Sequence, residues 1–335
     1  MLLLPIGDTL FATPTVRALR LGYPDARITA LAYPSNAGIL EANPDLDRLL
    51  LHPTAPTWPG PMGYVRFLWK LRRSRFDLVV RFGPAQWWMS FVMRPGQSRR
   101  LDFPIRQWFL PLGKRLVRER HAVSTYATLL TAREREHLPA GLVLHCTAAD
   151  RTRVDRLLAS LAGAPILAVH PGGEGLRGMK RWPLARFVEV SRSLAVRLGA
   201  RVVVLGGGDE TELAARFTAQ VEDAVSLVGV LSLGETVAVL ERSSLFVGND
   251  SAPLHMAGAL GVPTVGIYGP TNPVNFRPRG PRVRVVRSSL PCSPCFHFVG
   301  SAPLWAGSRC KLPLCLHAVS TAMVEQAARE VLSGA

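Results

Sequence analysis

The sequence has few lysines, few acids and no long apolar run. Lysine accounts for four of its 40 basic residues, and 24 acidic residues leave a formal net charge of +16 over 335 residues. No uninterrupted apolar stretch approaches about 18 residues, so no membrane-spanning helix is expected. The apolar start, MLLLPIGDTLFATP, has no basic segment before it and is interrupted by Asp8, so it does not fit a signal peptide. The protein is therefore expected in the cytoplasm.

The positive charge is concentrated in one region. Residues 61–120 contain fourteen Lys or Arg and three acids, so this region carries +11 of the total. It also contains four of the seven tryptophans: Trp69, Trp87, Trp88 and Trp108. Basic residues mixed with Trp suit an anionic membrane surface or a phosphorylated acceptor, and they also suit nucleic acid. A solvated, arginine-rich surface explains the same composition, so these interpretations stay open.

Strand and helix patterns alternate along the chain, which predicts an α/β protein with mainly parallel sheets. In the first half, the apolar pattern predicts strands at Arg27–Tyr33 and Asp77–Phe82, and a short first strand at Leu2–Pro5. Thr13 and Pro14 predict the start of a helix, as its N-cap and its first helical residue.

A second α/β series begins near Pro165. Pro165–Gly173 is predicted as a strand followed by a glycine loop, Arg201–Gly208 as a strand that ends in glycines, and Arg242–Gly248 and Pro263–Gly269 as further strands. The predicted helices are Trp182–Leu198, Glu210–Val221 and, at the end of the chain, Thr321–Leu332. The glycine turn after the second of these strands, GGGDE, is not a G-x-G-x-x-G fingerprint. A redox dinucleotide therefore loses support as the ligand.

Polar and glycine residues gather where these strands end. Asp250 and Ser251 follow a buried strand, Gly172 and Gly173 follow another, and Lys180 precedes a helix. Ligands of open α/β sheets bind outside the carboxyl ends of the strands, and a helix N-terminus suits a phosphate. Asp250 would accept hydrogen bonds from sugar hydroxyls beside that phosphate, while Lys180 reaches a diphosphate. A helix cap alone explains Asp250 or Ser251, but the three strand ends together favour a ligand site.

Three segments carry a resemblance that covers essentially the whole chain. IGDTLFATPTVRALR, HPGGEGLRGMKRWPLARF and VGNDSAPLHMAGALGVPTVGIYGPTNP resemble the signature regions of glycosyltransferase family 9, the ADP-heptose:lipopolysaccharide heptosyltransferases and their relatives. The resemblance implies a GT-B fold, in which two Rossmann-like domains with mainly parallel sheets face each other across a cleft. It divides the chain into an acceptor-binding domain at 1–155, a nucleotide-sugar-binding domain at 156–320 and a C-terminal helix at 321–335 that packs back on the first domain.

The resemblance also implies roles for individual residues. Asp8, in the GDxxxxTP motif, would be the general base on the acceptor hydroxyl, Lys180 would neutralise the donor diphosphate, and Asp250 would hold donor sugar hydroxyls. The remaining donor-binding residues would be Ser251, Ala252 and Pro253 along the phosphates, His255 in support of that loop, Glu210 near the adenosine, and Gly172 and Gly173, which replace hydroxyl residues of some members. Removal of the acceptor proton and stabilisation of the leaving ADP need no metal.

Four of the five cysteines have the spacing of a metal site. Cys292, Cys295, Cys310 and Cys315 form C-x2-C…C-x4-C, which resembles the ligand set of a structural zinc ion or an iron–sulfur cluster. In a reducing cytoplasm structural disulfides are not expected. Free thiols in a proline-rich loop are the alternative, and both remain open.

The resulting hypothesis is an inverting, metal-independent glycosyltransferase that moves a heptose from ADP-heptose to a lipopolysaccharide core or related cell-envelope glycan. Its partners would be a nucleotide-sugar, an anionic glycolipid acceptor and the inner face of the cytoplasmic membrane, without nucleic acid. The alternatives are a family member with a different nucleotide-sugar or acceptor, and a non-catalytic nucleotide-sugar-binding protein at the membrane. Retention of Asp8, Lys180 and Asp250 favours an enzyme.

Overall fold

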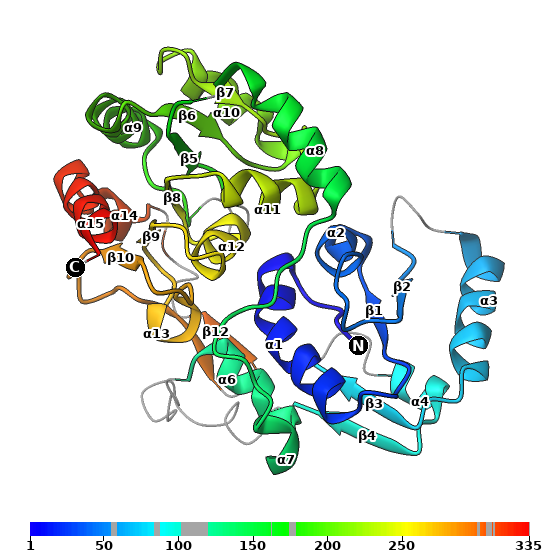
Figure 1. Ribbon diagram of the computed structural model, residues 1–335. Coiled ribbons are helices and arrows are strands. Elements are labelled where there is room, and N and C mark those ends of the chain that lie inside the picture. The colour runs from blue at the N-terminus through cyan, green and yellow to red at the C-terminus, as the bar shows by residue number, and fades with distance from the viewer. Residues whose placement is uncertain are drawn as a thin grey trace. The chain divides into compact units, whose positions relative to one another are not determined.

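The computed structural model describes residues 1–54, 59–83, 88–101, 120–161, 163–173, 179–299, 302–305, 310 and 312–334 (Figure 1). The chain forms two compact units, one of Met1–Val143 with Val299–Ala302 and the other of Leu144–Phe298 with Pro303–Ala335. Among the described residues, no helix is both long enough and apolar enough to cross a bilayer.

The first unit contains two pairs of parallel strands: β1 (Thr29–Ala32) with β2 (Arg48–Leu51), and β3 (Leu78–Arg81) with β4 (Gln97–Arg100). The start of the chain bonds to both pairs, since Leu2 bridges Ala32 and the Met1 amino group donates to the Val80 carbonyl oxygen at 2.6 Å. The predicted strands around β1 and β3 are confirmed. The predicted strand at Leu2–Pro5 is wrong, because Leu2 makes an isolated bridge and Pro5 already caps a helix.

Two helices of this unit contribute to an apolar cluster with its strands. The helices of the unit are α1 (Ile6–Gly22), α2 (Ala37–Leu40), α3 (Gly60–Arg73), α4 (Met89–Met93), α6 (Ala122–Tyr126) and α7 (Ala132–Arg135), with 3-10 turns η1 (Pro34–Asn36) and η3 (Ala127–Leu129). The apolar cluster contains Leu3, Leu31, Leu50, Leu71, Val79, Met89 and Met93, of which Leu71 comes from α3 and Met89 and Met93 from α4. Leu71 is the buried residue of α3, so this helix has one inward face and one outward face.

Helix α1 begins at Ile6, seven residues before the predicted N-cap Thr13. That prediction is wrong because Pro14 lies inside the helix. A proline removes the N–H that would bond the carbonyl four residues earlier, here that of Leu10. The Thr13 hydroxyl donates to the Leu10 carbonyl oxygen at 2.8 Å instead, so the helix continues. The earlier start places Asp8 in the first turn of α1, where its negative charge suits the helix dipole.

The second unit contains a six-stranded sheet with every described pair of neighbours parallel. Its strands, in the order β10-β9-β8-β5-β6-β7, are β10 (Val283–Arg287), β9 (Thr264–Tyr268), β8 (Leu245–Asn249), β5 (Ile166–His170), β6 (Arg201–Val204) and β7 (Val225–Ser226). Chain order reverses between β5 and β8. Such a switch point places a ligand site outside the carboxyl ends of these two strands.

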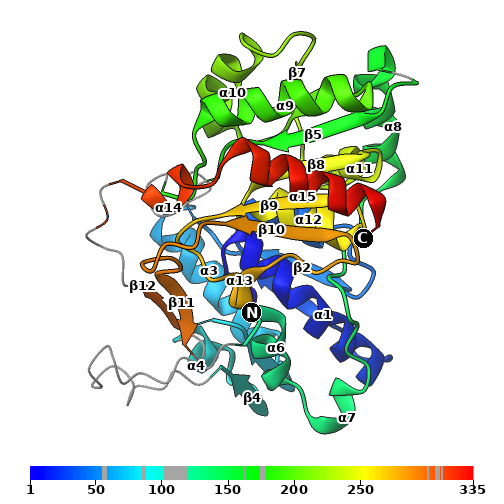
Figure 2. The same ribbon diagram turned by 90° about the vertical axis from the view of Figure 1, so that its left-hand side faces the viewer.

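Helices cover both faces of this sheet, with α9 (Leu184–Leu198) and α15 (Thr321–Ser333) on one face and α11 (Leu233–Glu241) and α12 (Ala252–Ala259) on the other (Figure 1). Figure 2 shows α15 along β9 and β10, and its main contacts are with these strands and α9, within the second unit. The remaining elements are α8 (Ala148–Leu157), α10 (Thr211–Thr218), α13 (Pro273–Phe276), α14 (Leu314–His317), β11 (Phe296–Val299), β12 (Ala302–Trp305), η4 (Ala159–Leu161) and η6 (Gly208–Glu210).

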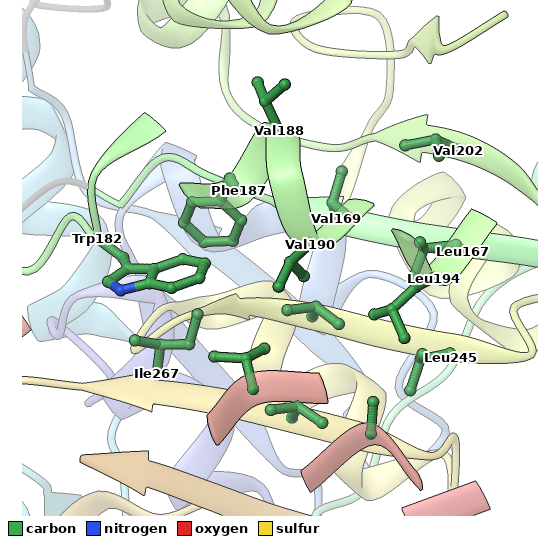
Figure 3. Packing of buried hydrophobic residues seen from close by; sticks show 14 of the residues in the cluster. Leu167, Val169, Trp182, Phe187, Val188, Val190, Leu194, Val202, Leu245 and Ile267 are labelled. Carbon is green, nitrogen blue, oxygen red and sulfur yellow. The ribbon is translucent and has the colours of Figure 1, made fainter. Parts of the chain in front are cut away.

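Trp182 and Phe187 anchor the core beneath α9 (Figure 3). Their rings meet edge to face with centroids 5.1 Å apart, a preferred geometry for aromatic pairs. The Trp182 indole N–H donates to the Val319 carbonyl oxygen at 3.0 Å, so the buried ring leaves no unpaired donor. This packing fixes the start of α9, which begins four residues after Lys180.

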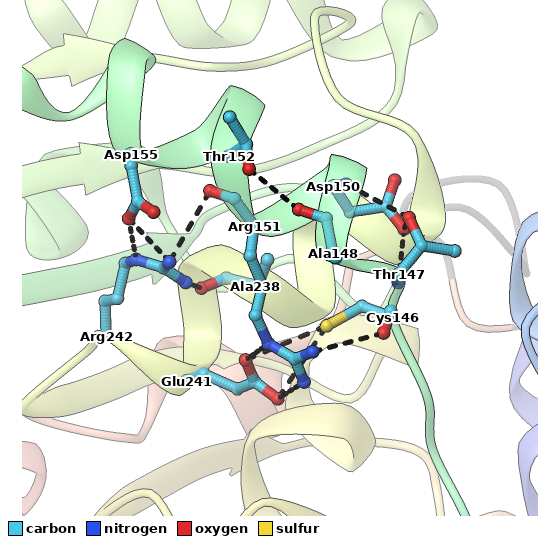
Figure 4. Close-up of polar contacts among 10 residues, drawn as sticks. All are labelled: Cys146, Thr147, Ala148, Asp150, Arg151, Thr152, Asp155, Ala238, Glu241 and Arg242. Carbon is cyan, nitrogen blue, oxygen red and sulfur yellow. Dashed lines mark hydrogen bonds and ion pairs between the residues drawn. The ribbon is translucent and has the colours of Figure 1, made fainter.

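Polar contacts fasten α8 to α11 (Figure 4). Arg151 donates two hydrogen bonds to the Glu241 carboxylate, both at 2.9 Å, and Arg242 pairs with Asp155. Thr147 and Asp150 form a capping box at the start of α8. These contacts explain why α8 groups with the second unit, whose first residue is Leu144. The predicted boundary after residue 155 lies inside this helix.

Candidate functional site

The carboxyl ends of β5 and β8 bring together most of the residues that the sequence singled out. β5 ends at His170, before Gly172 and Gly173, and β8 ends at Asn249, before Asp250 and Ser251. Helix α12 then begins at Ala252, with Pro253 in its first turn. The backbone N–H groups at the start of α12 therefore point toward the edge of the sheet where these loops lie.

Lys180 and Asp250 form a close ion pair at this edge, with the Lys180 Nζ atom 2.6 Å from the Asp250 Oδ2 atom. The Nε2 atom of His255, from α12, lies 3.5 Å from the Oδ1 atom of Asp250. Asp250 is only 5% exposed. Burial by itself raises the pKa of this carboxyl, but Lys180 and His255 lower it far below its usual value. Asp250 is therefore an anion at neutral pH, with both oxygens facing cationic or polar partners.

Aromatic residues line the neighbourhood of this pair. Burial and the negative charge of Asp250 raise the pKa of Tyr268 well above its usual value, so its hydroxyl stays protonated. That hydroxyl donates to the Phe276 carbonyl oxygen at 2.9 Å. Phe276 stacks on Phe296, and the Lys180 Nζ atom lies 5.9 Å from the centroid of the Phe296 ring. The attraction between the Lys180 ammonium group and the Phe296 ring favours one arrangement of the long Lys180 side chain.

Asn249, which the sequence reasoning missed, joins three segments of the site. Its fully buried side-chain amide donates to the carbonyl oxygens of Pro171 and Gly172, at 2.9 and 2.8 Å. Its Oδ1 atom accepts a hydrogen bond from the backbone N–H of Trp182 at 3.0 Å. The glycine loop after β5 and the segment around Lys180 are thus held to the end of β8. An Asn between an apolar strand and Asp250 is the sequence signal that could have indicated it.

Glu210 lies in a second buried network, with both carboxylate oxygens bonded inside the protein. Gly173 N–H donates to Oε1 at 2.6 Å and Gly207 N–H to Oε2 at 3.1 Å. The Nε2 atom of His170 lies 3.0 Å from Oε2, and the Nδ1 atom of His170 lies 2.8 Å from the Ser251 hydroxyl oxygen. Glu210 thereby connects the loops after β5, β6 and β8.

The charge state of Glu210 follows from these contacts. Burial raises the pKa of its carboxyl, but the hydrogen bond and charge of His170 and the two backbone donors outweigh burial and lower the pKa to about 2. An ionised carboxylate only accepts hydrogen bonds, so Nε2 of His170 carries a proton. The predicted contact of Glu210 with adenosine remains a prediction, and the structure adds a role in holding the loops.

Gly172 is required by this network. A Cβ atom at position 172 would lie 2.0 Å from the Oε1 atom of Glu210, far inside contact distance. The neighbouring Gly173 has φ +123°, a conformation that strongly favours glycine. The sequence analysis treated these glycines as replacements that lose a hydroxyl contact. In the structure the missing side chain of Gly172 makes room for the Glu210 carboxylate, whereas Gly173 is favoured by its backbone conformation.

Ser251 and the first residues of α12 differ in part from expectation. Ser251 occupies the N-cap position, but its hydroxyl makes no capping bond to the helix. It contacts the Asn249 carbonyl oxygen at 3.0 Å as well as His170. The Ser251 hydroxyl therefore does not cap the backbone N–H groups at the start of α12. Ser251 and Ala252 each have such an N–H group, and Pro253 has none.

In the first unit, Asp8 accepts a hydrogen bond from a residue 118 positions away. The Tyr126 hydroxyl, from α6, donates to the Asp8 Oδ1 atom at 3.1 Å. Tyr126 is 2% exposed. Burial and the charge of Asp8 raise its pKa well above the usual value, so Tyr126 remains a hydrogen-bond donor. No motif in the sequence pointed to Tyr126, because its importance depends on the packing of α6 against α1.

The cysteines do not assemble into a metal site among the described residues, where no three His, Cys, Asp or Glu side chains are placed to hold an ion. All four are free thiols, with Cys315 buried and Cys292 and Cys310 exposed. Burial first, and then the charges of Cys315, Cys310 and Cys292, raise the pKa of the Cys295 thiol. Metal binding by this group stays a prediction.

Of the tryptophans in the basic region, Trp87 and Trp108 lie outside the described residues.

A comparison with known protein families decides the family of the chain. The model described as glycosyltransferase family 9 (heptosyltransferase) matches residues 66–306, which is more than two thirds of the chain. The chain belongs to this family. It is therefore a glycosyltransferase, as the three sequence segments predicted.

Named relatives agree with this assignment. Lipopolysaccharide heptosyltransferase 3 of Escherichia coli is 27% identical over 291 residues, which cover 81% of this chain and 83% of the relative. Lipopolysaccharide heptosyltransferase 2 of Escherichia coli K12 is 25% identical over 307 residues, covering 84% and 85%. Both matches extend through the two units described above.

Solved structures confirm the GT-B fold. A glycosyltransferase family 9 protein from Veillonella parvula matches with a TM-score of 0.75 and 21% identity, over 99% of this chain and 96% of that one. The E. coli ADP-heptose lipopolysaccharide heptosyltransferase II matches with a TM-score of 0.74 and 20% identity, over 98% and 96%. The iron-containing glycosyltransferase TibC of enterotoxigenic E. coli matches with a TM-score of 0.58 and 17% identity, over 98% of this chain and 76% of that one.

Proposed function

We propose that this glycosyltransferase moves a heptose from ADP-heptose to a lipopolysaccharide core or a related cell-envelope glycan, with inversion and without a catalytic metal. The observation that carries the proposal is the Lys180–Asp250 pair, 2.6 Å apart, beside the start of α12 at the switch point of the second sheet. The names of the relatives support the sugar and the acceptor, since both are lipopolysaccharide heptosyltransferases.

The donor would bind at the carboxyl ends of β5 and β8. Lys180 supplies a positive charge for the diphosphate, and the N–H groups of Ser251 and Ala252 supply donors at the positive end of the α12 dipole. Asp250, kept ionised by Lys180 and His255, accepts hydrogen bonds from the sugar hydroxyls. As the bond between the anomeric carbon and ADP breaks, this prearranged charge stabilises the negative charge that develops on ADP.

The acceptor hydroxyl would be activated by Asp8. As its oxygen bonds to the anomeric carbon from the side opposite ADP, its proton passes to the Asp8 carboxylate, and one such displacement inverts the anomeric centre. The Tyr126 hydroxyl donates to Oδ1 and so fixes the orientation of the carboxylate. Tyr126 is thus a positioning residue for the base.

Two finer points belong to the same proposal. The enzyme would work at the inner face of the cytoplasmic membrane as a peripheral protein, which the net charge of +16 supports. The four cysteines would hold a structural zinc ion or iron–sulfur cluster away from the chemistry. The C-x2-C…C-x4-C spacing supports this, whereas among the described residues no three His, Cys, Asp or Glu side chains are placed to hold an ion.

The test combines a nucleotide panel with one substitution. ADP should raise the melting temperature more than UDP, GDP or CMP, because a ligand stabilises the state that binds it. Asp8→Asn should keep ADP binding and lose transfer to a lipopolysaccharide acceptor by at least about 100-fold, the lower part of the range for general-base catalysis. Asp25→Asn, at an exposed position just after α1, is the matched control.

The possible outcomes separate the alternatives. Selective stabilisation by another nucleotide would assign a different sugar donor. ADP binding without transfer of heptose by the unmodified protein, to either lipopolysaccharide or its core oligosaccharide, would favour a non-catalytic binding protein. An Asp8→Asn variant with normal turnover would remove Asp8 from the mechanism.

A further inference from the structure

Helix α3 of the first unit has an outward face that no described element covers. Met62, Val65 and Trp69 are 71%, 63% and 55% exposed, although large apolar side chains are usually buried. Their spacing of three and four residues places them in one stripe along the helix. Their inward counterparts Phe67, Leu68 and Leu71 pack into the core of the unit, so the outward stripe is not needed to hold α3 in place.

The same face is strongly cationic. Arg66, Lys70, Arg72 and Arg73 are all exposed, and the fourteen-residue helix contains no acid. The Arg73 guanidinium lies over the Trp69 ring, 3.7 Å from its centroid. Arg66, Trp69, Lys70, Arg73 and Ser74 together line a shallow hollow on the surface. The three cations of this hollow suit the phosphate of a lipid headgroup, and the indole suits the apolar acyl chains beside it.

We propose that α3 docks the enzyme on an anionic lipid bilayer, with Met62, Val65 and Trp69 in the interface and the four cations among the headgroup phosphates. Charge complementarity selects this occupant, since a helix without acids repels a basic surface and attracts an anionic one. The apolar stripe favours a bilayer over nucleic acid, because phosphate backbones offer no apolar layer for Met62 and Val65. Figure 1 shows α3 along the outer side of the first unit.

This inference rests on the peripheral membrane location proposed above and names the helix that would provide it; it is tested without donor or acceptor. Purified protein is sedimented with vesicles of phosphatidylglycerol and phosphatidylethanolamine, and separately with phosphatidylcholine vesicles. Binding is expected to the anionic vesicles only, weaker at high salt. Arg66→Glu with Lys70→Glu should weaken it at least about 30-fold, because each cation near such a surface contributes about 1 kcal/mol, and 1.4 kcal/mol is tenfold.

Helix α9 provides the matched control. Arg192 and Arg197 are exposed on this helix beside the exposed Val196, so Arg192→Glu with Arg197→Glu makes the same change in net charge elsewhere. This control variant should bind the anionic vesicles like the wild type. Trp69 reports insertion directly: its fluorescence should shift to shorter wavelength on binding, and Trp69→Phe should lose most of that shift while still binding.

Several results would overturn the proposal. Equal loss in the α3 and α9 variants would show that only the net charge matters. Absence of binding to anionic vesicles, or binding that the α3 substitutions leave unchanged, would remove α3 as the docking element. Competition by inorganic phosphate or a random-sequence DNA duplex at concentrations that leave the vesicles intact would show a phosphate-binding surface in place of a bilayer-docking one. None of these results depends on whether heptose is the transferred sugar.

Discussion

Replacement of Glu210 by Gln tests the buried network at the end of β5. The carboxylate accepts from Gly173, Gly207 and His170 at 2.6, 3.1 and 3.0 Å. Gln keeps the shape but removes the charge, and its amide nitrogen turns one acceptor into a donor that faces another donor. The contribution of the charge follows from the pKa, which falls from 4.5 to about 2 on folding. At 1.36 kcal/mol per unit, this difference corresponds to about 3 kcal/mol of stability.

The pH dependence gives the prediction its sign. Because the pKa of Glu210 is lower in the folded protein, its contribution is complete above pH 4.5 and is lost as the pH falls toward 2. Glu210→Gln should therefore lower the free energy of unfolding at pH 7 by about 3 kcal/mol. For a unit of this size, this corresponds to a melting temperature about 6–12 °C lower. Below pH 4.5, the difference in free energy of unfolding between wild type and variant, measured by urea titration, should become smaller.

A matched variant and a binding measurement complete this test. Glu212→Gln, exposed on α10 two residues later, should leave stability within about 0.5 kcal/mol of wild type. Two results would refute the stabilising role of the Glu210 network: a Glu210→Gln variant as stable as wild type at pH 7, or a stability difference that does not change with pH. If stability is unchanged and only ADP affinity falls, Glu210 contacts the nucleotide directly, as the family resemblance implies.

Three further predictions concern the remaining groups. Lys180→Ala should weaken ADP-sugar binding in calorimetry and slow transfer, with partial recovery in Lys180→Arg. Lys180→Ala also removes the cation that pairs with the buried Asp250 carboxylate, so it should lower the free energy of unfolding by about 3–5 kcal/mol. Unchanged affinity and rate would reject this role. Tyr126→Phe should lower kcat with little change in KM and move the acid limb of the pH–kcat profile upward, since the Asp8 carboxylate loses a donor, whereas Tyr23→Phe should do neither. An unshifted profile would leave Tyr126 with a structural role only. Protein purified without oxygen should contain about one zinc ion or an iron–sulfur cluster; four titratable thiols without metal would contradict the cysteine prediction.

The sequence predicted the four central strands of the second sheet, β9, β8, β5 and β6, because their pattern is unambiguous, and it missed the outer strands β7 and β10. Every residue of β5, β8 and β9 is buried, and such short continuous apolar runs are typical of parallel strands covered on both faces. Lys180, Asp250 and His255 could be grouped for the same reason, since each lies just beyond a strand or near a helix start. The start of α1 was not predictable from propensity, because the Thr13 hydroxyl compensates for the proline inside the helix.

The residues that sequence reasoning missed act through partners distant in the chain. Tyr126, which donates to Asp8, lies 118 residues from it, and His170 lies 40 residues from its partner Glu210. Neither pairing leaves a local periodicity or cap signal, so only the packed structure reveals it. Gly172 shows the consequence most clearly. Judged alone, it has merely lost a hydroxyl, but beside Glu210 it is the position where a Cβ would lie 2.0 Å from the carboxylate. A side chain at 172 and the present Glu210 arrangement therefore exclude each other.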